Sequence, residues 1–297
     1  MIFSFPPSPL HLSSQHLLPP EHPPGQFPKM VSLKERLNSY FEPTLLLLFS
    51  LYYIPYTLLY SPQLLLQPRA FRAKWFENFW LFLGPKMAAS PLQVDHIDSL
   101  LKRAHGTVLE LGPGGGDQMY HYDSSKITRM LGAEPNAFLH PKLKQKAAEA
   151  GIKSYFAIEA GAQPASLLPA LKSAGVVTGN LPDDGIFDTI VAVKSLCSAP
   201  QKQMYETVAV IQALLKPGGE FLFFEHLGNN DDRITRAYAS VVDLVWPMLM
   251  GGCRLDGKLD KVVMGMGGWD ERDLHTTGEF KGHEMFRYVK GICRKAS

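Results

Sequence analysis

A glycine-rich run is the first place in this 297-residue chain where residue types and spacing could do chemistry. Residues 108–117 read Val-Leu-Glu-Leu-Gly-Pro-Gly-Gly-Gly-Asp. Glycines allow a tight turn and let the backbone approach a ligand closely. A nicotinamide fingerprint needs a third glycine where Asp117 stands, which disfavours a nicotinamide-dependent reductase. What remains is an acidic residue followed by alternating glycines, at Glu110, Gly112, Gly114 and Gly116.

A carboxylate follows at the spacing that a ribose site requires. Residues 131–136 read Leu-Gly-Ala-Glu-Pro-Asn, which places Glu134 about twenty residues beyond the first glycine. A carboxylate there can accept hydrogen bonds from both ribose hydroxyls. The alternative, a surface glutamate in a turn, fits the position and spacing less well.

A third motif, Lys-Pro-Gly-Gly at residues 216–219, predicts a turn between a helix and a strand.

Alternating segments predict the elements that position these residues. Such βα alternation predicts an α/β domain with a mostly parallel sheet and helices on both faces. The expected strands are 107–111, 127–133, 154–158, 187–193, 221–225 and, more loosely, 283–295, and the expected helices are 141–150 and 202–215.

The N-terminal third divides into a leader and a hydrophobic segment. Residues 1–42 are expected to form a disordered, proline-rich leader. Residues 43–67 contain no charged residue and approach the ~20 residues that span a bilayer, so we expect a membrane anchor there. Because Pro55 would kink a helix, a bent span and a monotopic hairpin both stay open, as does a buried helix of a soluble domain. The catalytic domain is expected over residues 68–297.

Charge and cysteine usage exclude several classes of function. The net charge is +2 and no Lys/Arg run stands out, so we expect no nucleic-acid partner. The three cysteines, Cys197, Cys253 and Cys293, are widely spaced and form no CxxC pair. We therefore expect no disulfide framework, no metal, and a reducing compartment for the catalytic part.

The glycine run, Glu134 and the Pro-Gly-Gly turn together resemble motifs of class I S-adenosylmethionine-dependent methyltransferases. The resemblance implies a Rossmann-like fold, with a central seven-stranded sheet preceded here by the N-terminal hydrophobic helix, and S-adenosylmethionine as cofactor. Residues 158–163 depart from the usual acidic pattern near the adenine, so Gln163, or less directly Glu159, would take that place. The cofactor-binding residues it implies are Glu110, Gly112, Gly114, Gly116, Glu134, Pro135, Gln163, Lys194 and Cys197.

A closer resemblance is to the membrane-associated methyltransferase-like family seven, which includes alkyl thiol methyltransferases. It rests on Leu-Cys-Ser at residues 196–198, on Phe-Glu-His at 224–226, and on Asp-Leu-Val-Trp and Gly-Cys-Arg-Leu within residues 243–255. It implies a small lipophilic acceptor, a thiol above all. It also implies attachment to membrane lipid at the endoplasmic reticulum or a lipid droplet, with the catalytic domain facing the cytosol.

Methyl transfer to a thiol chiefly needs alignment, and a nearby base assists it. The catalytic candidates are His226, Asp243 and Glu225, each of which could instead make a structural hydrogen bond. Residues 238–250, with Met264 and Met266, predict an apolar acceptor pocket. Two alternatives stay open: an N- or O-methyltransferase of secondary metabolism, and a non-catalytic membrane-associated protein that binds S-adenosylmethionine.

Overall fold

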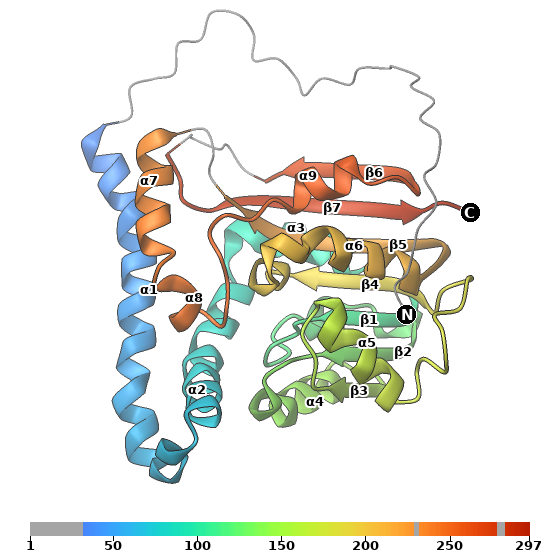
Figure 1. Ribbon diagram of the computed structural model, residues 1–297, viewed down its shortest axis with the longest axis horizontal. Coiled ribbons are helices and arrows are strands. Elements are labelled where there is room, and N and C mark those ends of the chain that lie inside the picture. The colour runs from blue at the N-terminus through green and yellow to red at the C-terminus, as the bar shows by residue number, and fades with distance from the viewer. Residues whose placement is uncertain (1–31, 229–231, 278–282) are drawn as a thin grey trace, which may run out of the picture.

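A seven-stranded sheet crosses the molecule in the order β3-β2-β1-β4-β5-β7-β6 (Figure 1). A computed structural model describes residues 32–228, 232–277 and 283–297, so the predicted leader over 1–31 lies outside the described residues. Strands β1 to β5 pair in parallel, whereas β7 is antiparallel to both of its neighbours. The strands are β1 Gly106–Leu111, β2 Ile127–Ala133, β3 Tyr155–Ile158, β4 Phe187–Val193, β5 Leu215–Leu227, β6 Trp269–Thr276 and β7 Arg287–Lys295.

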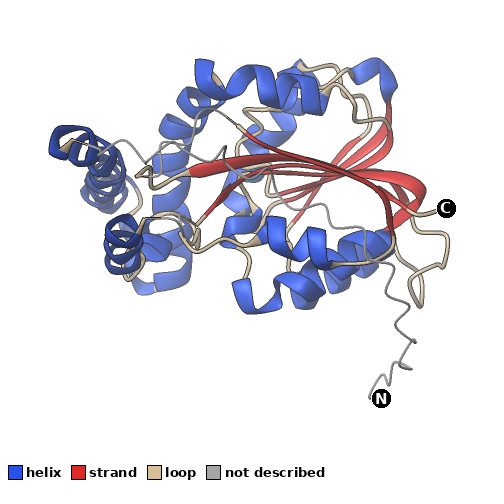
Figure 2. Cartoon of the chain, turned by 90° about the horizontal axis from the view of Figure 1, so that it is seen from above, coloured by secondary structure: helices blue, strands red, loops and turns tan. Residues whose placement is uncertain are grey.

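Helices cover both faces of this sheet (Figure 2). They are α3 Pro91–Leu101, α4 His140–Glu149, α5 Pro164–Ser173, α6 Met204–Leu214 and α9 Leu259–Gly265. Short 3-10 helices join the elements: η1 Pro62–Leu66, η2 Met119–His121, η3 Ser124–Lys126, η4 Ala137–Leu139, η5 Leu196–Ser198 and η6 Gln201–Gln203. The mostly parallel sheet with helices on both faces confirms the predicted fold class.

The central strands separate two apolar cores. Successive side chains of a strand point to opposite faces of the sheet. In β1, Leu109 and Leu111 accordingly join one buried cluster, with Phe221 and Phe223 of β5, while Val108 joins the other. Because helices cover both faces, residues 190–193 of β4 are all apolar and alternate between the two cores.

A second group of helices stands at one end of the sheet, at the left of Figure 1. It comprises α1 Leu33–Tyr60, α2 Pro68–Ala88, α7 Arg233–Val242 and α8 Trp246–Leu249. Their side chains meet in a third apolar cluster around Phe79 and Trp246. This group closes the end of the sheet where the functional motifs lie.

Helix α1 begins earlier than the sequence indicated. Ser32 and Glu35 form a capping box, in which each side chain accepts a hydrogen bond from the other residue's backbone N–H. Residues 33–42 are therefore helical, which corrects their assignment to a disordered leader. The helix continues through Pro43 and Pro55, and among the described residues it is the one long and apolar enough to cross a membrane.

Candidate active site

A cavity of about 530 Å³ opens at the carboxyl ends of the central strands. In open parallel sheets ligands bind at this edge, and the volume lies within the roughly 300–1,000 Å³ typical of small-molecule sites. Five predicted cofactor residues lie on its wall in addition to the two glycines described next. They are Glu134, Pro135, Gln163, Lys194 and Cys197.

The glycine-rich turn after β1 forms one side of the cavity through Gly112 and Gly114. Both have a positive φ, of 66° and 60°, which favours glycine. A Cβ on Gly114 would lie 2.6 Å from Nε1 of Trp80, so α2 packs directly on the turn. Gly116 has a φ of 81° but packs on α4 through Lys146, outside the cavity wall.

Glu134, at the end of β2, presents a buried carboxylate to the cavity, with 5% of its surface exposed. Its Oε2 accepts a hydrogen bond from the backbone N–H of Gly114 at 2.9 Å, and its Oε1 accepts one from that of Asn136 at 2.8 Å. Burial raises the pKa of Glu134 to about 7, although both backbone donors oppose the rise. Each oxygen keeps acceptor capacity for a ligand hydroxyl.

Glu110 lies behind the turn and does not line the cavity. Its carboxyl group is buried on the face of the sheet that also holds Tyr122. Burial raises the pKa of Glu110 to about 8, and the charge of Glu134 adds to the rise. The structure therefore places Glu110 under the turn, where it has no direct path to a ligand in the cavity.

Glu225 shapes the loop after β4. Its Oε1 accepts hydrogen bonds from the backbone N–H groups of Ser195 and Leu196, both at 2.8 Å. The preceding residue of that loop, Lys194, has a φ of 52°, an uncommon conformation for a residue with a side chain. Burial lowers the pKa of Lys194 to about 8. Glu225 thus positions the cavity wall without being part of it.

Asp243 has a comparable supporting position. It follows α7, and its Oδ1 accepts a hydrogen bond from the backbone N–H of Leu255 at 2.9 Å. Its Oδ2 pairs with Nη2 of Arg254 at 2.6 Å. The carboxylate is engaged in holding the loop that carries Cys253, and it does not line the cavity.

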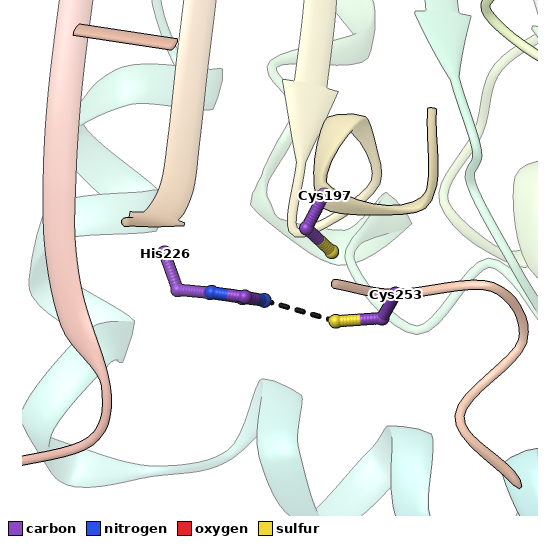
Figure 3. A group of neighbouring side chains, drawn as sticks. All are labelled: Cys197, His226 and Cys253. Carbon is purple, nitrogen blue, oxygen red and sulfur yellow. Dashed lines mark hydrogen bonds between the residues drawn. The ribbon is translucent and has the colours of Figure 1, made fainter. Parts of the chain in front are cut away.

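His226 is the one catalytic candidate that lines the cavity, and two cysteines stand beside it. Its Nε2 lies 2.9 Å from Sγ of Cys253, and the sulfur of Cys197 faces the same space (Figure 3). The contact with Cys253 and burial raise the pKa of the Cys197 thiol well above its ordinary value. Because these residues come from distant parts of the chain, the sequence did not indicate that Cys253 meets the other two.

Helix α2 forms the opposite wall of the cavity, a role the sequence did not predict. Phe76 and Trp80 stack with ring centroids 5.5 Å apart and both line the cavity. The wall is continued by Arg69, Arg72, Ala73, Leu83 and Met87 of α2 and by Leu46 of α1.

Part of the remaining wall is apolar, and its residues correct part of the predicted acceptor pocket. Trp246 and Met250 line the cavity as expected, together with Phe286. Met266 is instead buried in the core beneath the sheet, and Met264 is 57% exposed on α9. Both lie outside the cavity, on α9 or directly after it, and α9 packs against α6.

The comparisons with known proteins define the fold. No protein-family model and no curated protein matches the chain. An O-methyltransferase family protein from Burkholderia thailandensis is similar at 16% identity and a TM-score of 0.52, over 76% of this chain and 60% of that one. The CurJ carbon methyltransferase is similar at 15% identity and a TM-score of 0.50, over 73% of this chain and 58% of that one. The chain therefore has the Rossmann-like fold of class I methyltransferases, with a sheet whose last strand in sequence, β7, is inserted antiparallel between β5 and β6.

Proposed function

We propose that the protein is an S-adenosylmethionine-dependent methyltransferase that acts on a small lipophilic acceptor, with a thiol as the favoured class. The observation that carries the proposal is the position of Glu134. Its carboxylate lines the cavity next to Gly112 and Gly114, at the carboxyl edge of a parallel sheet. A buried acceptor beside a glycine turn suits the ribose of a nucleoside-containing cofactor.

The residues present fit that cofactor. The backbone of Gly112 and Gly114 allows close approach, Glu134 accepts the ribose hydroxyls, and Gln163 stands near Gly161 where an adenine would lie. Bound there, S-adenosylmethionine would supply a methyl group on a sulfonium centre. The chain's contribution is then to align an acceptor with that methyl group and to exclude water.

Apolar side chains in the rest of the wall support a lipophilic acceptor. The large apolar side chains of the wall are Phe76 and Trp80 of α2 together with Trp246, Met250 and Phe286. Such a surface gains free energy by burying apolar ligand area, about 25 cal/mol for each Å². Cys197, His226 and Cys253 are the side chains there with chemistry suited to a thiol.

Membrane attachment is the second part of the proposal. Large apolar side chains are exposed on α1, η1, α2 and the segment from α7 to α8, and we call this set of residues the apolar face. It comprises Leu48, Phe49, Tyr52, Leu59 and Tyr60 of α1, Leu65 and Leu66 of η1, Leu81 and Phe82 of α2, and Ile234, Val241, Leu244, Val245 and Met248 of α7 and its continuation into α8. An exposed apolar surface of this extent supports contact with lipid.

The contacts of α1 favour the monotopic arrangement over a span. Arg36 pairs with Asp232 near one end of the helix, and Oγ of Ser50 donates to the carbonyl of Leu249 in the middle. Near the other end, Asn78 of α2 donates to the hydroxyl of Thr57. A helix that left the domain to cross a bilayer would lose all of these contacts, so we propose that α1 lies along the membrane surface with the domain on its cytosolic side.

The acceptor class is tested by product analysis. The purified full-length protein is incubated with S-adenosylmethionine and matched lipophilic thiols, amines and phenols, and methylated products are identified by mass spectrometry. We expect methylation of the thiols. Products from amines or phenols alone would support an N- or O-methyltransferase. Cofactor binding without any product from the panel would support the non-catalytic alternative.

A further inference from the structure

Three potential metal ligands converge on the wall of the cavity from three separate segments. Cys197 lies in η5 after β4, His226 lies in β5, and Cys253 lies in the loop after α8. Their two sulfur atoms and one ring nitrogen all lie within 4.8 Å of one another. Figure 3 shows the three side chains pointing toward one another. Sequence spacing cannot reveal such a group.

Hydrogen bonds brace these three segments against one another. The backbone N–H of Arg254 donates to the carbonyl of Cys197 at 2.9 Å, which joins the two cysteine loops directly. Glu225 holds the η5 loop beside His226 through its two backbone contacts. Asp243 holds the Cys253 loop through Leu255 and Arg254. The supporting roles of Glu225 and Asp243 therefore keep the three side chains together in advance of any ligand.

The donor set and its spacing match zinc. Tetrahedral zinc, with Zn–S near 2.3 Å and Zn–N near 2.0 Å, holds its ligands about 3.5–3.8 Å apart. Nε2 of His226 lies 2.9 Å from Sγ of Cys253 and all three donor atoms lie within 4.8 Å of one another, so shifts of up to about 1 Å would bring them to those spacings. In addition, the indole N–H of Trp246 points at Sγ of Cys253 at 3.4 Å, a contact that stabilises a thiolate.

We propose that Cys197, His226 and Cys253 form a zinc site whose fourth position faces the cavity. Two thiolates and one neutral imidazole would balance the charge of the ion. Three protein ligands with an open position are the arrangement of catalytic zinc sites, whereas structural sites are closed by a fourth protein ligand. All three residues line the cavity, so an acceptor could reach the ion.

The open position on the metal favours a thiol over an amine or a phenol as the acceptor. When a thiol binds there, the Zn–S bond forms, the S–H bond breaks heterolytically, and the proton leaves to solvent, because zinc binds the thiolate. This role of the metal rests on the proposed methyltransferase function. Binding of the metal itself does not, so the two are tested separately.

The test measures metal binding without turnover. The full-length protein in detergent is stripped with a chelator under reducing conditions and titrated with Zn²⁺, and then with Co²⁺ as a spectroscopic probe. We expect one equivalent to bind, with the visible absorption of tetrahedral cobalt bonded to thiolate. Addition of a long-chain alkanethiol should change that absorption, whereas the matched alcohol should not.

Variants locate the site. Cys253→Ser, Cys197→Ser and His226→Gln should each weaken zinc binding by more than about 100-fold, since loss of even an outer-shell partner costs 10- to 100-fold. Cys293→Ser is the matched control, because Cys293 is buried in β7 away from the cavity, and it should bind zinc as the parent does. An unchanged circular dichroism spectrum and an unchanged urea unfolding midpoint show that a variant is folded, and neither depends on the proposed function. Failure of the parent to bind zinc, equal loss in Cys293→Ser, or a Cys197–Cys253 disulfide under the same conditions would overturn the proposal.

Discussion

The buried carboxylates of this protein differ in what surrounds them, and the surroundings decide which one can hold a ligand. Glu134 and Glu225 both accept two backbone N–H groups. Glu225 uses a single oxygen for both and lies behind the loop, while Glu134 uses one oxygen for each and faces the cavity. Only the second arrangement leaves acceptor capacity where a ligand can reach it.

Replacing Glu134 with glutamine should weaken cofactor binding, with little change in the size and shape of the side chain. Loss of charge-assisted hydrogen bonds to two hydroxyls costs about 2–3 kcal/mol, or roughly 30- to 150-fold in affinity. Calorimetric titration with S-adenosylhomocysteine measures the affinity of the parent and of the variant. Glu159→Gln is the matched control, because Glu159 is exposed and outside the cavity wall, and its affinity should be unchanged. Equal losses in the two variants would contradict the assignment.

Cofactor affinity should also depend on pH. Since the pKa of Glu134 is raised to about 7, the carboxylate form that accepts both hydroxyls is lost as the pH falls through that value. Affinity should therefore be constant above pH 7 and fall by up to about tenfold for each pH unit below it. The same titration between pH 5.5 and 8.5, a range of about three units around that pKa, should give a flat profile for Glu134→Gln. A parent profile as flat as that of the variant would rule out Glu134 as the responsible group.

The sequence predicted the cavity-lining residues around the glycine turn better than those on the rest of the wall. The glycines and Glu134 are separated by short spacings that carry a local geometric meaning. The roles of His226, Glu225 and Asp243 depend on which loop each side chain meets, and that is set by tertiary packing. Sequence reasoning could name the three but could not separate the residue on the wall from the two that support it.

Among the elements, α2 and the glycine turn depend on each other. Trp80 of α2 occupies the space next to Gly114 that a side chain would fill. The turn therefore fixes how closely the helix approaches, and the helix closes the cavity. Neither element alone would enclose a ligand.

Gly114→Ala should destabilise the protein by about 2–4 kcal/mol, from a positive φ and from the contact with Trp80. Gly218→Ala is the matched control. Its φ is 72°, but a Cβ there would have no atom within 4 Å, so only the backbone cost of about 1–2 kcal/mol is expected. Urea unfolding measures both. Equal destabilisation of the two would show that Trp80 does not press on the turn.

The elements were predictable where a segment ends in a run of buried apolar residues. Strands β2 and β4 begin and end as predicted, and each finishes in at least four consecutive buried residues. Strand β6 was missed: it lies at the edge of the sheet, and Asp270, Glu271, Arg272 and Asp273 interrupt any apolar pattern. The lining role of α2 was missed because it depends on packing against distant glycines.

For the whole molecule, the apolar face and the cavity lie on the same group of helices. Leu46 and Phe76 face the cavity, while Leu48 and Phe82 of the same two helices are exposed on the outside. Under the proposed function, a lipophilic acceptor could pass from lipid to the cavity between these helices.

Leu244→Lys combined with Met248→Lys should weaken attachment to vesicles of neutral phosphatidylcholine. The two side chains are 76% and 61% exposed, and loss of their burial in lipid costs at least about 3 kcal/mol, roughly 100-fold in partitioning. Tyr205→Lys is the control, an apolar residue 61% exposed on α6. Co-flotation with vesicles measures the difference. Unchanged flotation of the double variant would argue against the apolar face as the lipid contact.

Methyl transfer that depends on Glu134 is tested by the formation of S-adenosylhomocysteine. The full-length protein in vesicles is given S-adenosylmethionine and a long-chain alkanethiol. We expect steady formation by the parent and little by Glu134→Gln at a cofactor concentration that saturates only the parent, with recovery of the variant when the cofactor concentration is raised about 100-fold. Formation that is equal in parent and variant at every cofactor concentration would contradict this dependence on Glu134.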